Sequence, residues 1–138
     1  MIGRLCGILL HKEAPSLVLD VGGVGYEIDA PMSTFYELPA TGQSVTLYTH
    51  LVVRDDAHLL YGFVRQTQRQ LFRQLLKVNG VGPRVALAIL SGLTDQEFMQ
   101  CLMQEDVARL IKVPGIGRKT AERLIIDLRD KVDPALMQ

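Results

Sequence analysis

A short glycine-containing segment occurs twice in this chain, at positions 35 residues apart. Residues 75–86 and residues 110–121 are identical at six of twelve positions. Each copy has an apolar run, a turn with the pattern glycine–apolar–glycine, and a second run that opens with basic or small residues. Because internal repeats mark duplicated supersecondary units, we expect two helix–turn–helix units in this half of the chain.

Each repeated turn has the features of a phosphate-binding site. Glycine at both turn positions permits positive φ and lets a ligand approach the main chain closely. The second helix of each unit begins with unpaired N–H groups, which favour an anion. Two such turns predict contact with two phosphate backbones. The candidate DNA-binding residues are Gly80, Val81, Gly82, Arg84, Gly115, Ile116, Gly117, Arg118, Lys119 and Arg123.

Basic side chains are expected to extend this contact surface. Arg123 lies four and five residues after Lys119 and Arg118, so it lengthens the basic face by one helical turn. Lys77 and Lys112 precede the turns and are either further phosphate contacts or ordinary surface lysines. Contacts made mainly by backbone N–H groups should depend on salt and on DNA shape rather than on base sequence.

Charge is distributed unevenly along the 138 residues. Residues 1–64 have three basic and seven acidic residues, whereas residues 65–138 have twelve basic and eight acidic residues. An acidic first half and a basic second half suit a nucleic-acid binder with its contact surface in the second half. The start of the chain does not read as a signal peptide, and no apolar run is long enough to span a bilayer, so we expect a cytoplasmic protein without membrane contact. Cys6 and Cys101 are expected to be reduced core thiols.

The first half has the pattern of five short strands. One helical turn is expected at 33–38, between the third and fourth strands. This order predicts a five-stranded barrel of the OB type over residues 1–64, although an open sandwich would give a similar pattern. The expected strands are residues 2–11, 16–21, 25–30, 45–54 and 58–64.

From Thr67 onwards the apolar residues follow a helical period, so residues 65–138 are expected to form a helical domain and the chain an α+β protein. Thr67 and Thr94 each fit a capping box at a helix start, and Asp133-Pro134 is expected to close the last helix. Glycines 80, 92 and 115 stand where helix C-termini favour them. The expected helices are residues 68–78, 83–91, 95–103, 106–112 and 118–131.

Several kinds of chemistry are not expected. Arg118-Lys119-Thr120 follows two glycines but lacks the spacing of a nucleotide-binding phosphate loop, so ATP hydrolysis is excluded. The three histidines lack the spacing of metal ligands, and no nucleophilic triad stands out. We therefore expect a non-catalytic protein with no cofactor and no metal site. A nuclease subunit and a protein-interaction scaffold remain alternatives, to be separated by metal binding at Asp55 and Asp56 and by DNA affinity at low salt.

Asp55 and Asp56 fall at the tip of a predicted hairpin. Aspartate is a common turn former, so a solvated turn is one interpretation. The other is that the two carboxylates lie near DNA and repel phosphate, which would exclude continuous duplex from that point.

The repeated turn resembles the helix-hairpin-helix motif of DNA-binding proteins that do not read sequence. With a strand-rich first half before it, the whole chain resembles the RuvA family of bacterial Holliday-junction-binding proteins. The segments that carry the resemblance are residues 1–5, 21–27, 35–39, 49–50, 52–57, 59–63, 79–83 and 114–124.

This resemblance implies a homotetramer, or an octamer of two tetramers, that holds a four-way DNA junction open for the RuvB motor while RuvC resolves it. It implies that the two glycine turns are phosphate clamps and that Asp55 and Asp56 form an acidic pin beside the crossover. Members of the family continue into a linker and a small helical domain that contacts the motor. We therefore expect that this chain is a fragment.

Overall fold

The computed structural model describes residues 1–131. Contacts between Cα atoms divide the chain into two compact units, the first of which ends at Arg69. The first unit contains five strands, and helix α2 (Gln66–Leu76) begins at its end and continues into the second unit. None of the helices in residues 1–131 has the length and apolarity needed to cross a bilayer.

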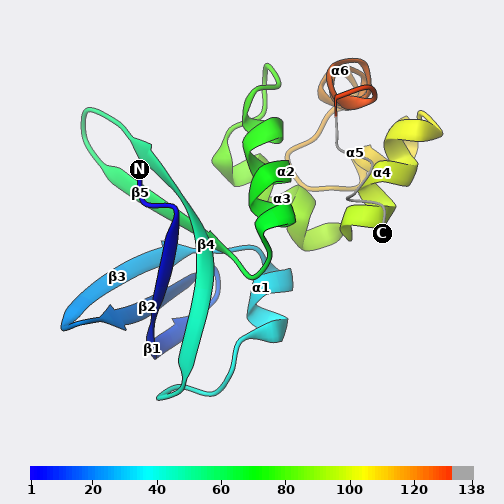
Figure 1. Cartoon of the computed structure of the whole chain (residues 1–138). Helices are drawn as coiled ribbons and strands as arrows, with labels where there is room; N and C mark the ends of the chain where they lie inside the picture. The colour runs from blue at the N-terminus through cyan, green and yellow to red at the C-terminus, as the bar shows by residue number, and fades with distance from the viewer. Residues whose placement is uncertain (132–138) are drawn as a thin grey trace. The chain divides into compact units, whose positions relative to one another are not determined.

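The five strands close into a barrel in the order β1-β2-β3-β5-β4 (Figure 1). All neighbours pair antiparallel except β3 and β5, which pair in parallel. The predicted OB-type barrel is therefore confirmed, and the open sandwich is excluded. The strands are β1 Arg4–Glu13, β2 Ser16–Val21, β3 Val24–Asp29, β4 Ser44–Val53 and β5 His58–Phe63.

Alternating apolar residues form the core of the barrel. Successive side chains of a strand point to opposite faces, so Leu17 and Leu19 of β2 are fully buried while Val18 between them is only partly covered. The same alternation places Cys6 of β1 on the outside, next to the buried Leu5. The prediction that Cys6 is a core thiol is thus wrong. Cys101, in the helical unit, is buried as predicted, and this burial raises the pKa of its thiol.

Helix α1 (Met32–Glu37) lies between β3 and β4 in the chain order, one residue earlier than predicted. Its last residue, Glu37, accepts a hydrogen bond from Arg65 at 2.8 Å. Both side chains are exposed, so this ion pair contributes little to stability.

Strand β4 changes partner along its length. Its first half, Ser44–Tyr48, pairs with β1, and its second half, Tyr48–Val53, pairs with β5. The N–H of Thr49 still donates to the carbonyl of Gly3, just before β1. Beyond Thr49, β5 is the strand that pairs with β4. The end of the β4–β5 hairpin is therefore a two-stranded ribbon that extends past the other strands (Figure 1).

Helices α3 (Pro83–Gly92), α4 (Asp95–Met103), α5 (Val107–Ile111) and α6 (Arg118–Leu128) follow α2. Together the five helices confirm the predicted helical organisation. Helix α2 starts at Gln66 rather than 68, so Thr67 lies inside the helix and the predicted capping box there is wrong. Helix α6 ends at Leu128, earlier than predicted. The expected helix end at Asp133-Pro134 lies outside the described residues.

The predicted capping box at Thr94 is confirmed. The Thr94 hydroxyl accepts from the N–H of Glu97 at 3.1 Å, and the Glu97 carboxylate accepts from the N–H of Thr94 at 2.9 Å. These hydrogen bonds, together with the nearby Arg109 guanidinium, lower the pKa of Glu97 below its ordinary value of 4.5. Ionised Glu97 therefore stabilises the fold above pH 4.5, and this stabilisation is lost as the pH falls through the lower pKa of the folded state.

We predict that Thr94→Ala destabilises the helical unit by about 1 kcal/mol at neutral pH, because an N-cap acceptor is lost. We predict that Glu97→Gln flattens the decrease in stability below pH 4.5, because the residue that titrates has been removed. Urea unfolding at a series of pH values measures both effects. If the free energy of unfolding of Glu97→Gln falls as steeply below pH 4.5 as that of the parent, the second prediction is contradicted.

Candidate nucleic-acid interface

The two repeated turns have the same backbone conformation. The first glycine of each, Gly80 and Gly115, has φ of 91° and 90°. The second, Gly82 and Gly117, has φ −93° and ψ −179° in both copies and is the N-cap of the following helix. The sequence repeat is therefore a structural repeat, in which helices α2 and α3 form one hairpin and α5 and α6 form the other.

Hydrogen bonds close both turns in the same way. The N–H of Val81 donates to the carbonyl of Val78 at 3.1 Å, and the N–H of Ile116 donates to the carbonyl of Val113 at 3.2 Å. The side chains of Val81 and Ile116 are each 5% exposed. The middle residue of each turn is thus held by the core, and its N–H is used inside the turn.

Only the first glycine of each turn has a backbone that requires glycine. Residues other than glycine rarely adopt φ near +90°, which explains Gly80 and Gly115. The backbone of Gly82 and Gly117 is open to any residue, and a Cβ added at either would meet nothing within 4 Å. Positive φ, which glycine permits at both turn positions, is therefore adopted at the first position and not at the second. The space around these two positions is open, and packing within the fold does not require glycine there.

The start of each second helix is free of side-chain caps. Neither Gly82 nor Gly117 supplies a capping hydrogen bond, so the first N–H groups of α3 and α6 lack intrahelical acceptors. Gly92, by contrast, is the last residue of α3 and does not adopt positive φ. The prediction that glycines 80, 92 and 115 cap helix C-termini is therefore wrong, since Gly80 and Gly115 each lie four residues beyond the ends of α2 and α5.

The predicted basic residues are on the surface. Arg84 is in the first turn of α3, and Arg118 and Lys119 open α6, with Arg123 one turn further along. All four are exposed. The Nε atom of Arg118 donates to the Glu122 carboxylate at 3.2 Å. An exposed pair of this kind is weak, so Arg118 is free to exchange Glu122 for another anion.

Tertiary packing also brings the two hairpins together. A cavity of about 260 Å³ is lined by Asn79 and Gly80 of the first turn and by Lys119, Thr120 and Arg123 of helix α6. In Figure 1 the turn between α2 and α3 lies beside α6. Asn79 and Thr120 were not expected at the site, because sequence spacing cannot show that residues 41 positions apart share a cavity.

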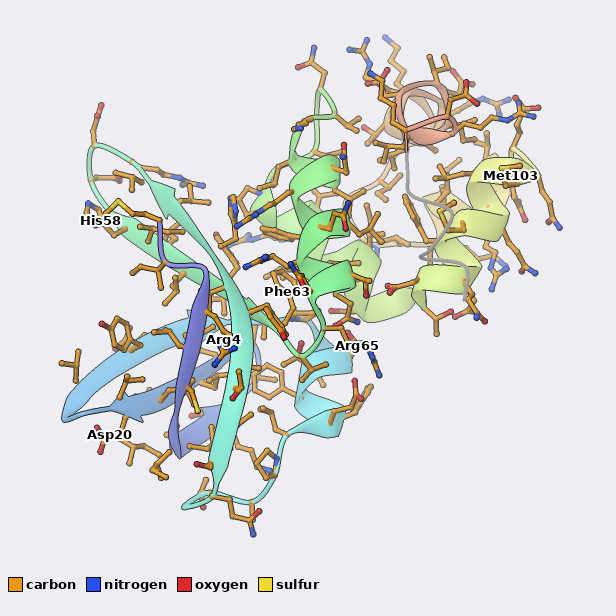
Figure 2. All side chains as sticks on the ribbon, in the orientation of Figure 1. Arg4, Asp20, His58, Phe63, Arg65 and Met103 are labelled. Atoms are coloured by element: carbon orange, nitrogen blue, oxygen red, sulfur yellow. The ribbon has the colours of Figure 1, made fainter. Side chains whose placement is uncertain are left out.

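The two aspartates are at the tip of the β4–β5 ribbon. Val53 pairs with His58, and the N–H of Arg54 donates to the carbonyl of Ala57 at 2.8 Å. Asp55 and Asp56 form the exposed end of this turn. His58, the first residue of β5, marks this end of the ribbon in Figure 2. In residues 1–131, no group of three or more His, Cys, Asp or Glu side chains is placed to hold a metal ion.

Comparison with known proteins assigns both halves of the chain. Residues 1–62 match the RuvA N terminal domain, and residues 72–130 match the SAM-like helix-hairpin-helix tandem. Proteins named Holliday junction branch migration complex subunit RuvA are 60% identical over 99% of this chain in Shewanella denitrificans and 62% identical over 96% of it in Thioalkalivibrio sulfidiphilus. The chain belongs to the RuvA family.

The RuvA family match extends over nearly all of the chain but not over all of its relatives. The chain spans 67% of the Shewanella denitrificans protein, 66% of the Thioalkalivibrio sulfidiphilus protein and 65% of the Pseudomonas aeruginosa protein, to which it is 56% identical. It thus corresponds to about two thirds of a RuvA subunit.

We predict that the two glycines of each RuvA turn differ in what they contribute to stability. Gly80→Ala or Gly115→Ala should destabilise the helical unit by roughly 1–3 kcal/mol, because a Cβ is strained at positive φ. The matched control Gly117→Ser should be at least as stable as the parent, because its backbone is ordinary, its Cβ meets no described atom within 4 Å, and serine suits an N-cap. Thermal unfolding followed by circular dichroism tests this, and equal losses in all three variants would contradict it.

Proposed function

We propose that this chain binds four-way junction DNA through its phosphate backbones, selecting the structure of the junction and not its base sequence. The observation that carries the proposal is the second glycine of each turn. Gly82 and Gly117 leave open space beside uncapped helix N-termini, although the fold there would accept a side chain. Space beside unpaired N–H groups is what the close approach of a phosphate requires.

In this proposal each hairpin clamps one phosphate backbone. The first N–H groups of α3 and α6 donate to phosphate oxygens, and the helix dipole favours the negative charge. Arg84 and the pair Arg118 and Lys119 neutralise that charge, and Arg123 extends the contact along α6. Val81 and Ile116, whose side chains are buried, hold each turn in shape from the core.

Asp55 and Asp56 are proposed to form the acidic pin of the same interface. Two carboxylates at the tip of a ribbon repel phosphate wherever that tip meets DNA. A continuous duplex places phosphates at every such point, whereas the centre of an open junction does not. The pin would therefore favour the junction by penalising the duplex.

In this proposal, the assembly and the partners are those that membership of the RuvA family implies. A homotetramer would present eight clamps to four duplex arms, and two tetramers would enclose the junction as an octamer. The RuvB motor and the RuvC resolvase are the proposed partners of the full-length protein in the cytoplasm, where it would be a non-catalytic subunit of the branch migration complex. The names of the relatives support the place in that complex.

A gel-shift titration tests the main proposal. A four-way junction and a linear duplex of equal length are each titrated with the chain at low and high salt. We expect the junction to be retained at a lower protein concentration, with both affinities falling as salt increases. Equal affinity for the two DNAs would overturn structure selectivity, and no affinity for either would favour a protein-interaction scaffold.

We predict that Arg84, Arg118 and Lys119 contribute to the salt dependence of binding and not to base preference. Changing any one to Ala should reduce the slope of log affinity against log salt by roughly 0.9, because one phosphate contact is lost. Titrations across a range of salt concentrations on two junctions of different sequence measure this. A variant with the parent slope but an altered preference between the two sequences would show that the residue reads bases.

We predict that Asp55→Asn/Asp56→Asn binds linear duplex more tightly while its junction affinity holds or rises. Charges a few ångströms apart interact by about 1–4 kcal/mol near a protein surface, and the variant removes this repulsion while Asn still suits the turn. The gain should shrink at high salt because exposed charges are screened. If the variant has the parent's affinity for both DNAs at low salt, Asp55 and Asp56 are only turn formers.

A further inference from the structure

The two hairpins have the same backbone but different surroundings. The first turn opens onto the cavity lined by Asn79, Gly80, Lys119, Thr120 and Arg123, which combines residues of both repeats. A Cβ added at Gly80 would lie 3.6 Å from the Oγ1 atom of Thr120. A Cβ added at Gly115 would lie 3.3 Å from a methyl carbon of Val85. The first turn therefore faces a hydroxyl group, and the second faces a hydrocarbon.

The sequence repeat shows how far this difference extends. Thr120 and Val85 are 35 residues apart and so occupy equivalent places in the two hairpins. By the same shift, Arg123 corresponds to Ala88, and Asn79 corresponds to Pro114. Of the two cations, only Lys119 has a basic counterpart, Arg84. Three of the four polar side chains around the first turn thus have apolar counterparts around the second.

The starts of the two second helices also differ. The first residue of α3 is Pro83, which has no N–H to donate. Its counterpart in α6 is Arg118, which has both an N–H and a cationic side chain. Helix α6 therefore offers an anion one more backbone donor than α3 does.

We propose that the cavity between the first turn and α6 is a composite phosphate site, and that it is the stronger of the two backbone anchors in each chain. Lys119 and Arg123 supply the positive charge, while the Asn79 amide and the Thr120 hydroxyl donate hydrogen bonds to phosphate oxygens. On the equivalent surface of α3, which faces the second turn through Val85, Arg84 takes the place of Lys119 while Val85 and Ala88 are apolar. This inference rests on the proposed function and adds that the two strands of a duplex arm are held with unequal strength.

Two pairs of variants at equivalent repeat positions test the inequality in the whole chain. Lys119→Ala should weaken junction binding about tenfold or more, and Arg84→Ala by about threefold, although both lower the salt slope by a similar amount. Thr120→Val should weaken binding by about three- to tenfold, and the reverse change Val85→Thr should leave it near that of the parent. Arg129→Ala, which removes a cation from the other end of α6, serves as the charge control and should bind like the parent. Thermal unfolding checks that every variant is folded.

Equal losses for Lys119→Ala and Arg84→Ala, or parental binding by Thr120→Val, would overturn the composite site. Titration with inorganic phosphate, followed by amide chemical shifts, separates this proposal from the proposed function. Saturable shifts at Asn79 and Thr120 that exceed those at Val85 and Ala88 support the site even if the chain fails to select junctions. Shifts of equal size around both turns, or none at Asn79 and Thr120, refute it.

Discussion

The left-handed backbone at Gly80 and Gly115 is the constraint on which the helical unit depends. This backbone reverses the chain within a few residues. The side chains of Val81 and Ile116 stay in the core, and their N–H groups donate the hydrogen bonds that close the turns. Because the turn is anchored from below, the next helix starts at a defined position with its N–H groups outward. The outward direction of these N–H groups is therefore a consequence of how the apolar middle residue packs.

The two repeated hairpins have equal backbones but unequal side chains. Equal turns are required by packing, since each apolar middle residue is buried. The residues around the turns are not under that constraint, because they are at the surface or partly exposed. Thr120 and Arg123 on one side, and Val85 and Ala88 on the other, show that a repeat can keep its geometry while its chemistry diverges.

In the barrel, the β4–β5 ribbon places two acidic residues at an exposed tip. Strand β4 leaves its pairing with β1 at Tyr48 and continues with β5 alone. This carries Asp55 and Asp56 out to a turn that no third strand covers. Two like charges at such a tip remain solvated and cost the fold little, which leaves them available to act on whatever approaches the tip.

Much of this protein was determined by the sequence itself. The alternation of apolar residues predicted all five strands, and the repeat predicted both hairpins, because local periodicity and glycine spacing are properties of short segments. Helix ends were less certain, as Thr67 shows: a segment that fits a capping box lies inside α2, where the backbone is already helical.

Closure of the barrel and the cavity beside Gly80 were decided only by the tertiary structure. The parallel pairing of β3 with β5 and the contact of Asn79 with α6 join segments far apart in the chain. No local pattern specifies which distant surfaces meet, since that depends on how all the apolar faces are buried together. The same packing made Gly82 and Gly117 informative, because only the folded backbone shows that no contact within residues 1–131 requires them to be glycine.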